Sequence, residues 1–121
     1  MSKLNLPHKA PVRFAQEIIF KDLDNDVAIV SIKFDSLPSL AMIVEASAQS
    51  SAAFGGNDKK MGFLVSLKNI KLLEELKYLS YHVEIFAEYQ LGGLSYFNFK
   101  VFSKDEKEKI LATGTFIIAL L

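Results

Sequence analysis

Residues 42–56 read MIVEASAQSSAAFGG, an almost unbroken run of apolar and small side chains that ends in two glycines. Upstream, Asp35, Ser36 and Pro38 are typical of a helix start, and the glycine pair is typical of a helix end. A helix that is apolar or small nearly all round is expected to be buried, and its alanines and serines would let a sheet approach closely. The stretch therefore predicts one buried central helix.

The segments on both sides of this helix are predicted to be strands. Residues 12–21 and 27–34 precede it, and the run DLDND between them, at 22–26, has turn chemistry. Downstream, residues 61–67 predict a short strand, whereas residues 69–79 fit either a helical turn or a strand with a bulge.

The last third of the chain predicts a series of hairpins. Residues 82–91 alternate between an apolar face and a polar face, and Gly92-Gly93 marks a two-residue turn before a strand at 94–103. The charged run KDEKE at 104–108 precedes a last strand at 110–120. The apolar face is expected to hold Val83, Ile85, Ala87 and Tyr89, and the polar face His82, Glu84 and Glu88.

Consecutive hairpins imply an antiparallel sheet, and a single apolar helix has to be covered by that sheet. The sequence therefore predicts an α+β protein of one domain, residues 1–121. Its antiparallel curved sheet would wrap around one long central helix, which is the arrangement called the hotdog fold.

Composition narrows the possible functions. Half of the 121 residues are hydrophobic, which is enough to fill the core of one domain. The 14 basic and 14 acidic side chains balance, which gives no electrostatic case for nucleic acid or for an anionic membrane. Cysteine is absent and the two histidines lie far apart, so neither a zinc–thiolate site nor another metal site is expected, and no cofactor is implied.

Neither end of the sequence predicts a membrane or export signal. Residues 1–14 lack the apolar run of a signal peptide, and the apolar run at 116–121 is far shorter than the roughly 20 residues that span a bilayer. A soluble cytoplasmic protein is expected.

Glu45 is the one full charge within the predicted helix. At about 100° per residue it shares a stripe with Met42, Gln49 and Ala52. A carboxylate in apolar surroundings is costly unless it is paired or hydrogen-bonded. Glu45 could be a catalytic acid, it could lie on a solvent-facing edge, or it could pair with a lysine or with the backbone of a neighbouring segment. The pattern alone leaves these interpretations open.

Three segments resemble the β-hydroxyacyl-acyl-carrier-protein dehydratases of fatty-acid synthesis, and more closely the smaller dehydratase-like branch found in aryl-polyene gene clusters. Residues 6–11 (LPHKAP) are similar to the family's opening L-P-H-R-x-P, and residues 45–49 (EASAQ) to its helix signature E-x-M-A-Q. Residues 61–64 (MGFL), followed by NIK at 69–71, are similar to the G-F-L strand of the polyene branch. The resemblance implies a hotdog dimer that acts on 3-hydroxyacyl thioesters of acyl carrier protein.

One family motif is missing from the sequence. The dehydratases carry G-H-F-P-G before the helix, whereas residues 31–38 read SIKFDSLP and contain no histidine. Dehydration requires a base, an acid, and donors that polarise the thioester oxygen. By resemblance, Glu45 is the acid and His8, near the mouth of the acyl tunnel, is a candidate base. Whether the chain is an enzyme by itself is therefore left open.

The predicted substrate contacts lie around the helix. Backbone amides near Ser39 and Leu40, at its N-terminus, could polarise the thioester, and Gln49 is the neighbour of Glu45. His82 is expected to be structural or solvated. The candidates for the acyl channel are Phe14, Met42, Phe54, Phe63 and Phe97, and the candidates for contact with an acidic carrier protein are Lys59, Lys60, Lys68 and Lys71.

Three functions fit these residues. The first is a dehydratase, or the partner subunit of one in a homodimer or heterodimer, with Glu45 meeting a histidine of the other chain. The second is a hotdog thioesterase in which Glu45 activates water. The third is a non-catalytic acyl-binding subunit.

Overall fold

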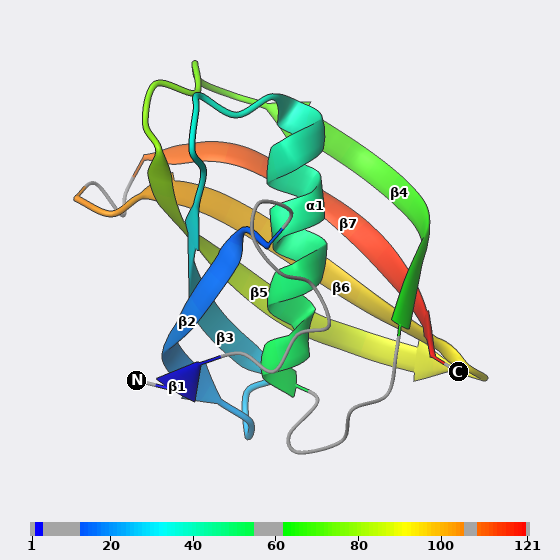
Figure 1. Ribbon diagram of the computed structural model, residues 1–121. Helices are drawn as coiled ribbons and strands as arrows, with labels where there is room; N and C mark the ends of the chain where they lie inside the picture. The colour runs from blue at the N-terminus through cyan, green and yellow to red at the C-terminus, as the bar shows by residue number, and fades with distance from the viewer. Residues whose placement is uncertain (1, 4–12, 55–61, 106–108, 121) are drawn as a thin grey trace.

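The computed structural model describes residues 2–3, 13–54, 62–105 and 109–120 (Figure 1). These residues form one antiparallel sheet in the order β1-β2-β3-β5-β6-β7-β4, together with one α-helix and a short 3-10 helix. The strands are β1 (Ser2–Lys3), β2 (Ala15–Asp22), β3 (Val27–Lys33), β4 (Gly62–Leu72), β5 (Ser80–Leu91), β6 (Leu94–Ser103) and β7 (Ile110–Leu120), and the helices are α1 (Leu40–Ser50) and η1 (Ser51–Phe54).

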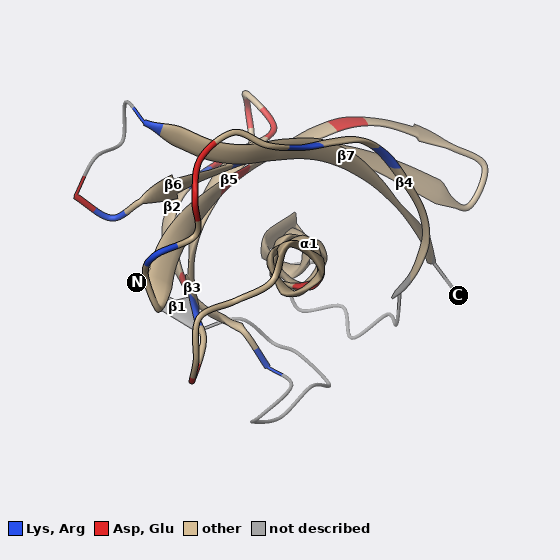
Figure 2. Ribbon diagram, turned by 90° about the horizontal axis from the view of Figure 1, so that it is seen from above, with Lys and Arg blue, Asp and Glu red and all other residues tan. Residues whose placement is uncertain are grey.

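The sheet curls around α1, as the view along the helix shows (Figure 2). Strands β2 and β3 lie on one side of the helix, β5, β6 and β7 pass behind it, and β4 lies on the other side (Figure 1). Most of the 11 residues of α1 are buried. The predicted α+β fold with a curved antiparallel sheet around one central helix is confirmed.

Local hydrogen bonds explain where α1 begins and how its serines are buried. Ser39 is the N-cap, and its Oγ accepts a hydrogen bond from the Met42 N–H at 3.2 Å. Inside the helix, Ser47 Oγ donates to the Ile43 carbonyl at 2.9 Å and Ser50 Oγ to the Ala46 carbonyl at 2.8 Å. Both hydroxyls are thus satisfied within the helix. The predicted end at Gly55-Gly56 lies just outside the described residues.

The strand after the helix is longer than the sequence predicts. A short strand at 61–67 was expected, but β4 continues to Leu72 because an irregularity between Lys68 and Lys71 lets it stay paired with β7. Asn69, in this irregularity, has a φ of 55°, a conformation that asparagine tolerates better than most residues. Of the two alternatives left open for 69–79, the bulged strand is therefore correct up to Leu72, and the helical turn is wrong.

The β5–β6 hairpin follows the predicted register except near its tip. Leu91 pairs with Leu94 across the turn, and Gly92 has a φ of 64°. A register shift between Ala87 and Tyr89 turns Tyr89 outward, where it is 51% exposed and stacks on Tyr96. The expectation that Tyr89 shares the buried face of Val83 and Ile85 is therefore wrong.

A close approach on β7 provides a test of the packing. A Cβ on Gly114 would overlap Ile70 Cδ1 and lie 2.8 Å from Phe99 Cε1, and Phe99 is fully buried. We expect Gly114→Ala to lower the free energy of unfolding by about 1–3 kcal/mol through overpacking, measured by urea denaturation.

The same substitution should cost less in an Ile70→Val background, which removes Cδ1. An equal cost in both backgrounds would contradict this packing.

Candidate active site on the central helix

Glu45 lies on a partly exposed stripe of α1. Ala41 is exposed and both Glu45 and Ala52 are partly exposed, at the spacing of residues on one helix face. Within the described residues, the side of α1 away from β6 and β7 carries no strand (Figure 2). Glu45 is therefore a half-buried carboxylate on an otherwise buried helix.

Gln49, one turn after Glu45, ties the helix to the start of the sheet. Its side chain is 4% exposed, and its Oε1 accepts hydrogen bonds from the Phe14 N–H at 2.8 Å and the Ala15 N–H at 3.1 Å. The chain that enters β2 is thereby fixed against the helix face that carries Glu45. The sequence predicted the adjacency of Glu45 and Gln49 but gave no signal for this backbone contact.

The predicted contacts at the helix N-terminus have structural roles in the described chain. Ser39 caps the helix, and the side chains of Leu40 and Met42 are partly buried against the core. The first backbone N–H groups of a helix still carry the positive end of its dipole, whatever the side chains do. The backbone amides of this turn therefore still offer positive charge, and their contact with a thioester oxygen stays a prediction.

The predicted acyl-channel residues fall into two groups. The Phe14 ring lies 5.0 Å from that of Phe34. The Phe54 ring lies 5.8 Å from that of Phe97, which stacks on Phe116 at 5.2 Å. Phe63 lies in β4, with its backbone paired to Ala119, and its side chain is outside the described part of the structure.

Of the two histidines, only His82 is within the described residues, and it lies on the other face of the sheet from α1. Its neighbours Tyr81 and Val83 point into the core and are fully buried, whereas His82 packs edge-on against Phe102, with ring centroids 5.9 Å apart. His82 therefore cannot meet Glu45 within one chain. His8, Lys59 and Lys60 lie outside the described residues, and Lys68 and Lys71 are exposed on β4.

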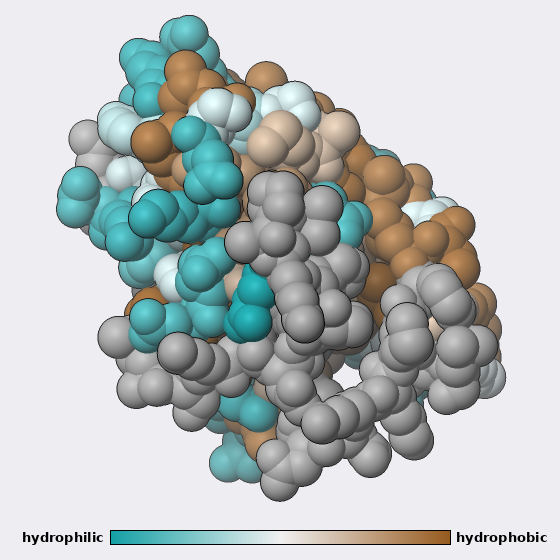
Figure 3. Space-filling view, in the orientation of Figure 1, coloured by the Kyte–Doolittle hydropathy of each residue, from teal (hydrophilic) through white to brown (hydrophobic). Residues whose placement is uncertain are grey.

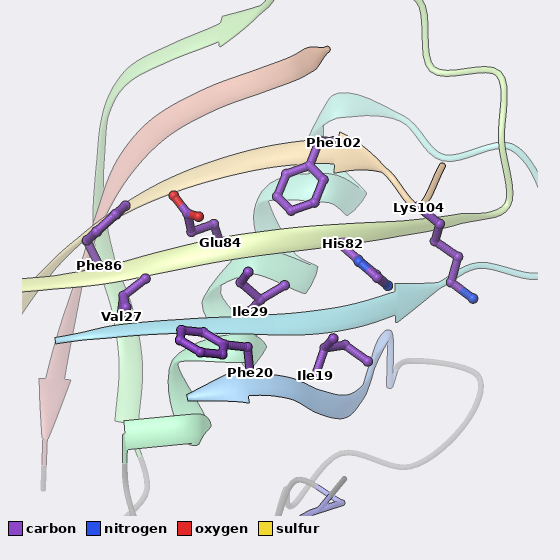
Figure 4. A pocket seen from close by; sticks show the side chains of 9 residues that line it. All are labelled: Ile19, Phe20, Val27, Ile29, His82, Glu84, Phe86, Phe102 and Lys104. Atoms are coloured by element: carbon purple, nitrogen blue, oxygen red, sulfur yellow. The ribbon is translucent and has the colours of Figure 1, made fainter. Parts of the chain in front are cut away.

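The outer face of the sheet holds a groove that the sequence analysis did not predict. Its volume is about 490 Å³, and residues of β2, β3, β5 and β6 line it (Figure 4). The sequence does carry a signal for this groove. Consecutive apolar residues, as in IIF at 18–20 and VAIV at 27–30, place apolar side chains on both faces of a strand and so on the outer face as well. Phe86, on the face of β5 predicted to be polar, was another such signal.

Two features are absent from the described residues. No group of three or more metal-binding side chains occurs among these residues. No helix in this part of the chain is both long enough and apolar enough to cross a membrane.

Comparisons with known proteins identify the fold. No protein-family model and no curated protein matches the chain. Among solved structures, the dehydratase heterocomplex ApeI:P from Xenorhabdus doucetiae superposes with a TM-score of 0.77 and 13% identity over 96% of this chain and 88% of that one.

Two further solved structures are similar to the chain. An HP0420 homologue from Helicobacter felis gives a TM-score of 0.68 and 18% identity over 98% of this chain and 97% of that one. A hypothetical thioesterase with coenzyme A from Streptococcus pneumoniae TIGR4 gives a TM-score of 0.64 and 13% identity over 87% of this chain and 84% of that one. The chain is a hotdog-fold protein. The predicted likeness to dehydratase-like hotdog proteins is confirmed at the level of the fold.

The Gln49 contact can be tested by stability. Gln49→Met removes the acceptor and leaves two backbone N–H groups unpaired beside the helix, one of them in fully buried Ala15. We expect a loss of about 2 kcal/mol in urea denaturation and faster hydrogen exchange at the Ala15 amide.

The matched control is Gln90→Met, because Gln90 is exposed and bonds only to Ser95 among its described partners. It should cost less than about 0.5 kcal/mol. A similar loss in both variants would contradict a specific role for Gln49.

Proposed function

We propose that the chain is a dehydratase-like hotdog subunit that binds 3-hydroxyacyl thioesters of acyl carrier protein, with Glu45 as the general acid. The observation that carries the proposal is the position of Glu45, a half-buried carboxylate on the side of the mostly buried helix α1 that no described strand covers. The shared fold with a dehydratase heterocomplex supports it.

The proposed reaction is the loss of water across the Cα–Cβ bond of the acyl chain. A base takes the Cα proton, the electron pair forms the C=C bond, and the Cβ–O bond breaks as Glu45 protonates the departing hydroxyl. The backbone amides of the first turn of α1 would stabilise negative charge on the thioester oxygen. The products are an enoyl thioester and water.

The acyl chain needs an apolar path, and the inner face of the sheet near β4 provides apolar surface. Phe97 and Ile118 are each 7% exposed there, and Leu64, paired with Ile118, is 37% exposed. Phe54, at the end of η1, packs on Phe97 and extends this surface to the helix. A second subunit against β4 would cover these side chains.

The base is either His8 or a histidine of a second chain. Five residues lie between His8 and Phe14, and the six residue steps that join them span at most about 20 Å when extended. Phe14 is held by Gln49, one turn from Glu45, so covalent geometry permits His8 to reach the carboxylate. In the alternative, Glu45 pairs with a histidine from a partner hotdog chain.

The β4 edge offers a surface for such a partner. β4 has 11 residues and stands at the edge of the sheet, with β7 as its one neighbour in the described chain. Leu64, Val65 and Leu67 are 37%, 53% and 46% exposed, and hydrophobic surface gathers on this side of the molecule (Figure 3). A long apolar edge is a template for pairing with another strand. The similar ApeI:P structure is itself a heterocomplex.

A thioesterase is the second candidate, because a hypothetical thioesterase from Streptococcus pneumoniae TIGR4 shares the fold. Glu45 would then activate water to attack the thioester carbonyl, and the product would be a free acid instead of an enoyl thioester. A non-catalytic acyl-binding subunit is the third candidate. Mass spectrometry of the acyl group separates all three.

The first functional test is Glu45→Gln, which keeps the size of the side chain and removes the acid. With a 3-hydroxyacyl carrier protein as substrate, wild type should lose water from the acyl group, and Glu45→Gln should reduce that rate by at least about 100-fold. The assay has two formats: one contains the chain alone, and the other contains the chain together with a complete hotdog dehydratase from the same organism.

Glu88→Gln is the matched control, since Glu88 is an exposed carboxylate on β5. It should leave the rate unchanged. Release of free acid that depends on Glu45 would replace the dehydratase by the thioesterase. Binding without turnover in either format would leave the non-catalytic subunit.

Assembly through the edge strand is tested with Val65→Asp, which places a charge on exposed β4. We expect the wild-type chain to form dimers, alone or with its partner, and Val65→Asp to weaken them at least about tenfold in light scattering. Leu91→Asp, at a residue that is 65% exposed at the β5–β6 turn, should have no effect. Equal assembly of both variants would place the interface elsewhere.

A further inference from the structure

A second hollow lies beside the groove on the outer face of the sheet. Its volume is about 350 Å³, and residues of β4, β5, β6 and β7 line it. Phe86 lines both spaces and so stands between them. Two lysines, two threonines and two asparagines contribute to the lining of the second hollow, and no described acidic residue does. We call this space the lysine cavity, after Lys71 and Lys100.

One row of side chains places the two lysines around a hydroxyl. Thr113 in β7 pairs with Lys71 on one side and with Lys100 on the other. A Cβ on the next residue, Gly114, would lie 2.8 Å from Phe99 in the core, so the side chain of Thr113 points to the outer face. The two lysine Cα atoms are two strand spacings apart, about 10 Å. Because a lysine ammonium stands on a flexible stem, both can reach the space above Thr113.

A side-chain amide in the neighbouring row adds further donors. Thr115 Oγ1 donates a hydrogen bond to Asn98 Oδ1 at 2.6 Å, across the β6–β7 pair. This bond uses the amide oxygen of Asn98 and leaves its Nδ2 donors for another partner. No described residue accepts a hydrogen bond from that nitrogen. The lysine cavity therefore presents ammonium, hydroxyl and amide donors and no carboxylate to accept from them.

The charges of the two lysines are not neutralised within the described chain. Neither Lys71 nor Lys100 forms an ion pair with a described residue. Glu84 stands opposite Lys100 in the register, but it lines the apolar groove instead of the lysine cavity, and Lys100 Nζ lies 6.0 Å from the centre of the Phe86 ring. Thr113 is three residue steps into β7, about 10 Å, so this row is set back from the charged segment at 104–109. The row as a whole carries two positive charges and one negative charge.

We infer that the lysine cavity binds the phosphate group of a small phosphate monoester, with the phosphate between Lys71 and Lys100 and the organic part over Phe86. A phosphate monoester carries close to two negative charges at neutral pH and offers three strong acceptor oxygens. These match two ammoniums together with the Thr113 hydroxyl, whereas a carboxylate brings one charge and two oxygens. The volume of about 350 Å³ is in the range of small-molecule sites. The sheet separates this site from α1, so it does not involve Glu45 and does not depend on the proposed reaction.

The experiment is a titration of the ¹⁵N-labelled full chain, followed by amide chemical shifts, with phenyl phosphate, benzoate and inorganic phosphate as probes. Phenyl phosphate should shift the amides of Phe86, Lys100 and Thr113 and leave those of α1 unchanged. Its affinity should exceed that of benzoate by about tenfold, because the second charge is absent from benzoate, and that of inorganic phosphate by about threefold, because only the phenyl ring covers Phe86. Between about pH 7.5 and pH 5 the affinity for phenyl phosphate should fall, since the monoester takes up its second proton near pH 6 while the lysines stay charged.

Variants assign the contacts of the phosphate. Lys71→Gln and Lys100→Gln should each weaken phenyl phosphate about fivefold, and Lys71→Arg should keep most of the affinity. Lys33→Gln, at an exposed lysine on β3, is the matched control and should have no effect. Thr113→Val keeps the shape of the side chain, removes its hydroxyl and should weaken binding about threefold. Circular dichroism confirms that each variant is folded.

Four results would overturn the inference. The first is an equal loss of affinity in Lys33→Gln and Lys71→Gln, which would leave only a general attraction between charges. The second is shifts confined to the first turn of α1, which would place the phosphate at the helix N-terminus. The third is benzoate binding as tightly as phenyl phosphate at neutral pH. The fourth is binding to phosphatidylcholine vesicles that depends on added phosphatidate, with no response to phenyl phosphate, which would place the phosphate on a lipid.

Discussion

The structure depends on the close contact between α1 and the curved sheet. Ala46, Ser47 and Ser50 have no exposed surface, and side chains this small let the helix axis approach the strands. The contact would fail if the serine hydroxyls were left unpaired in the core, but each donates to a carbonyl one turn earlier in the helix. Small side chains and internally satisfied donors together make an enclosed helix possible.

The side of α1 that no described strand covers is distinctive. In the described part of the chain the sheet leaves one stripe of α1 partly exposed, and Glu45 is the one charged side chain on that stripe. Gln49, on the adjoining position, is buried because it binds the backbone that enters β2. A carboxylate and a structural amide thus stand one turn apart, and the amide fixes the position of the chain beside the carboxylate.

The elements that the sequence predicted are those set by local chemistry. The central helix follows from its small apolar run, and the β5–β6 hairpin from alternation around Gly92-Gly93. The predictions that failed concern positions where pairing between strands determines the local structure. The left-handed Asn69 lets β4 continue along β7, and the shift at Ala87 turns Tyr89 outward, and neither has a local signature. Glu45 was identified from its charge, but the Gln49 contact and the outer groove depend on residues far apart in sequence.

The position of His82 limits how a dehydratase reaction could be completed. It lies on the outer face, with the sheet between it and α1, so His82 cannot be the base for Glu45 within one chain. The proposed dehydration needs a base as well as an acid, and the two candidates for that base are His8 and a histidine of another chain. The apolar β4 edge bears on the source of this base, because a strand that pairs there would bring a second subunit to the inner face of the sheet. With Glu45 as the proposed acid, a base from another chain would fit a subunit whose site is completed by assembly, and the β4 edge, which has one neighbour among the described strands, would offer the surface for it.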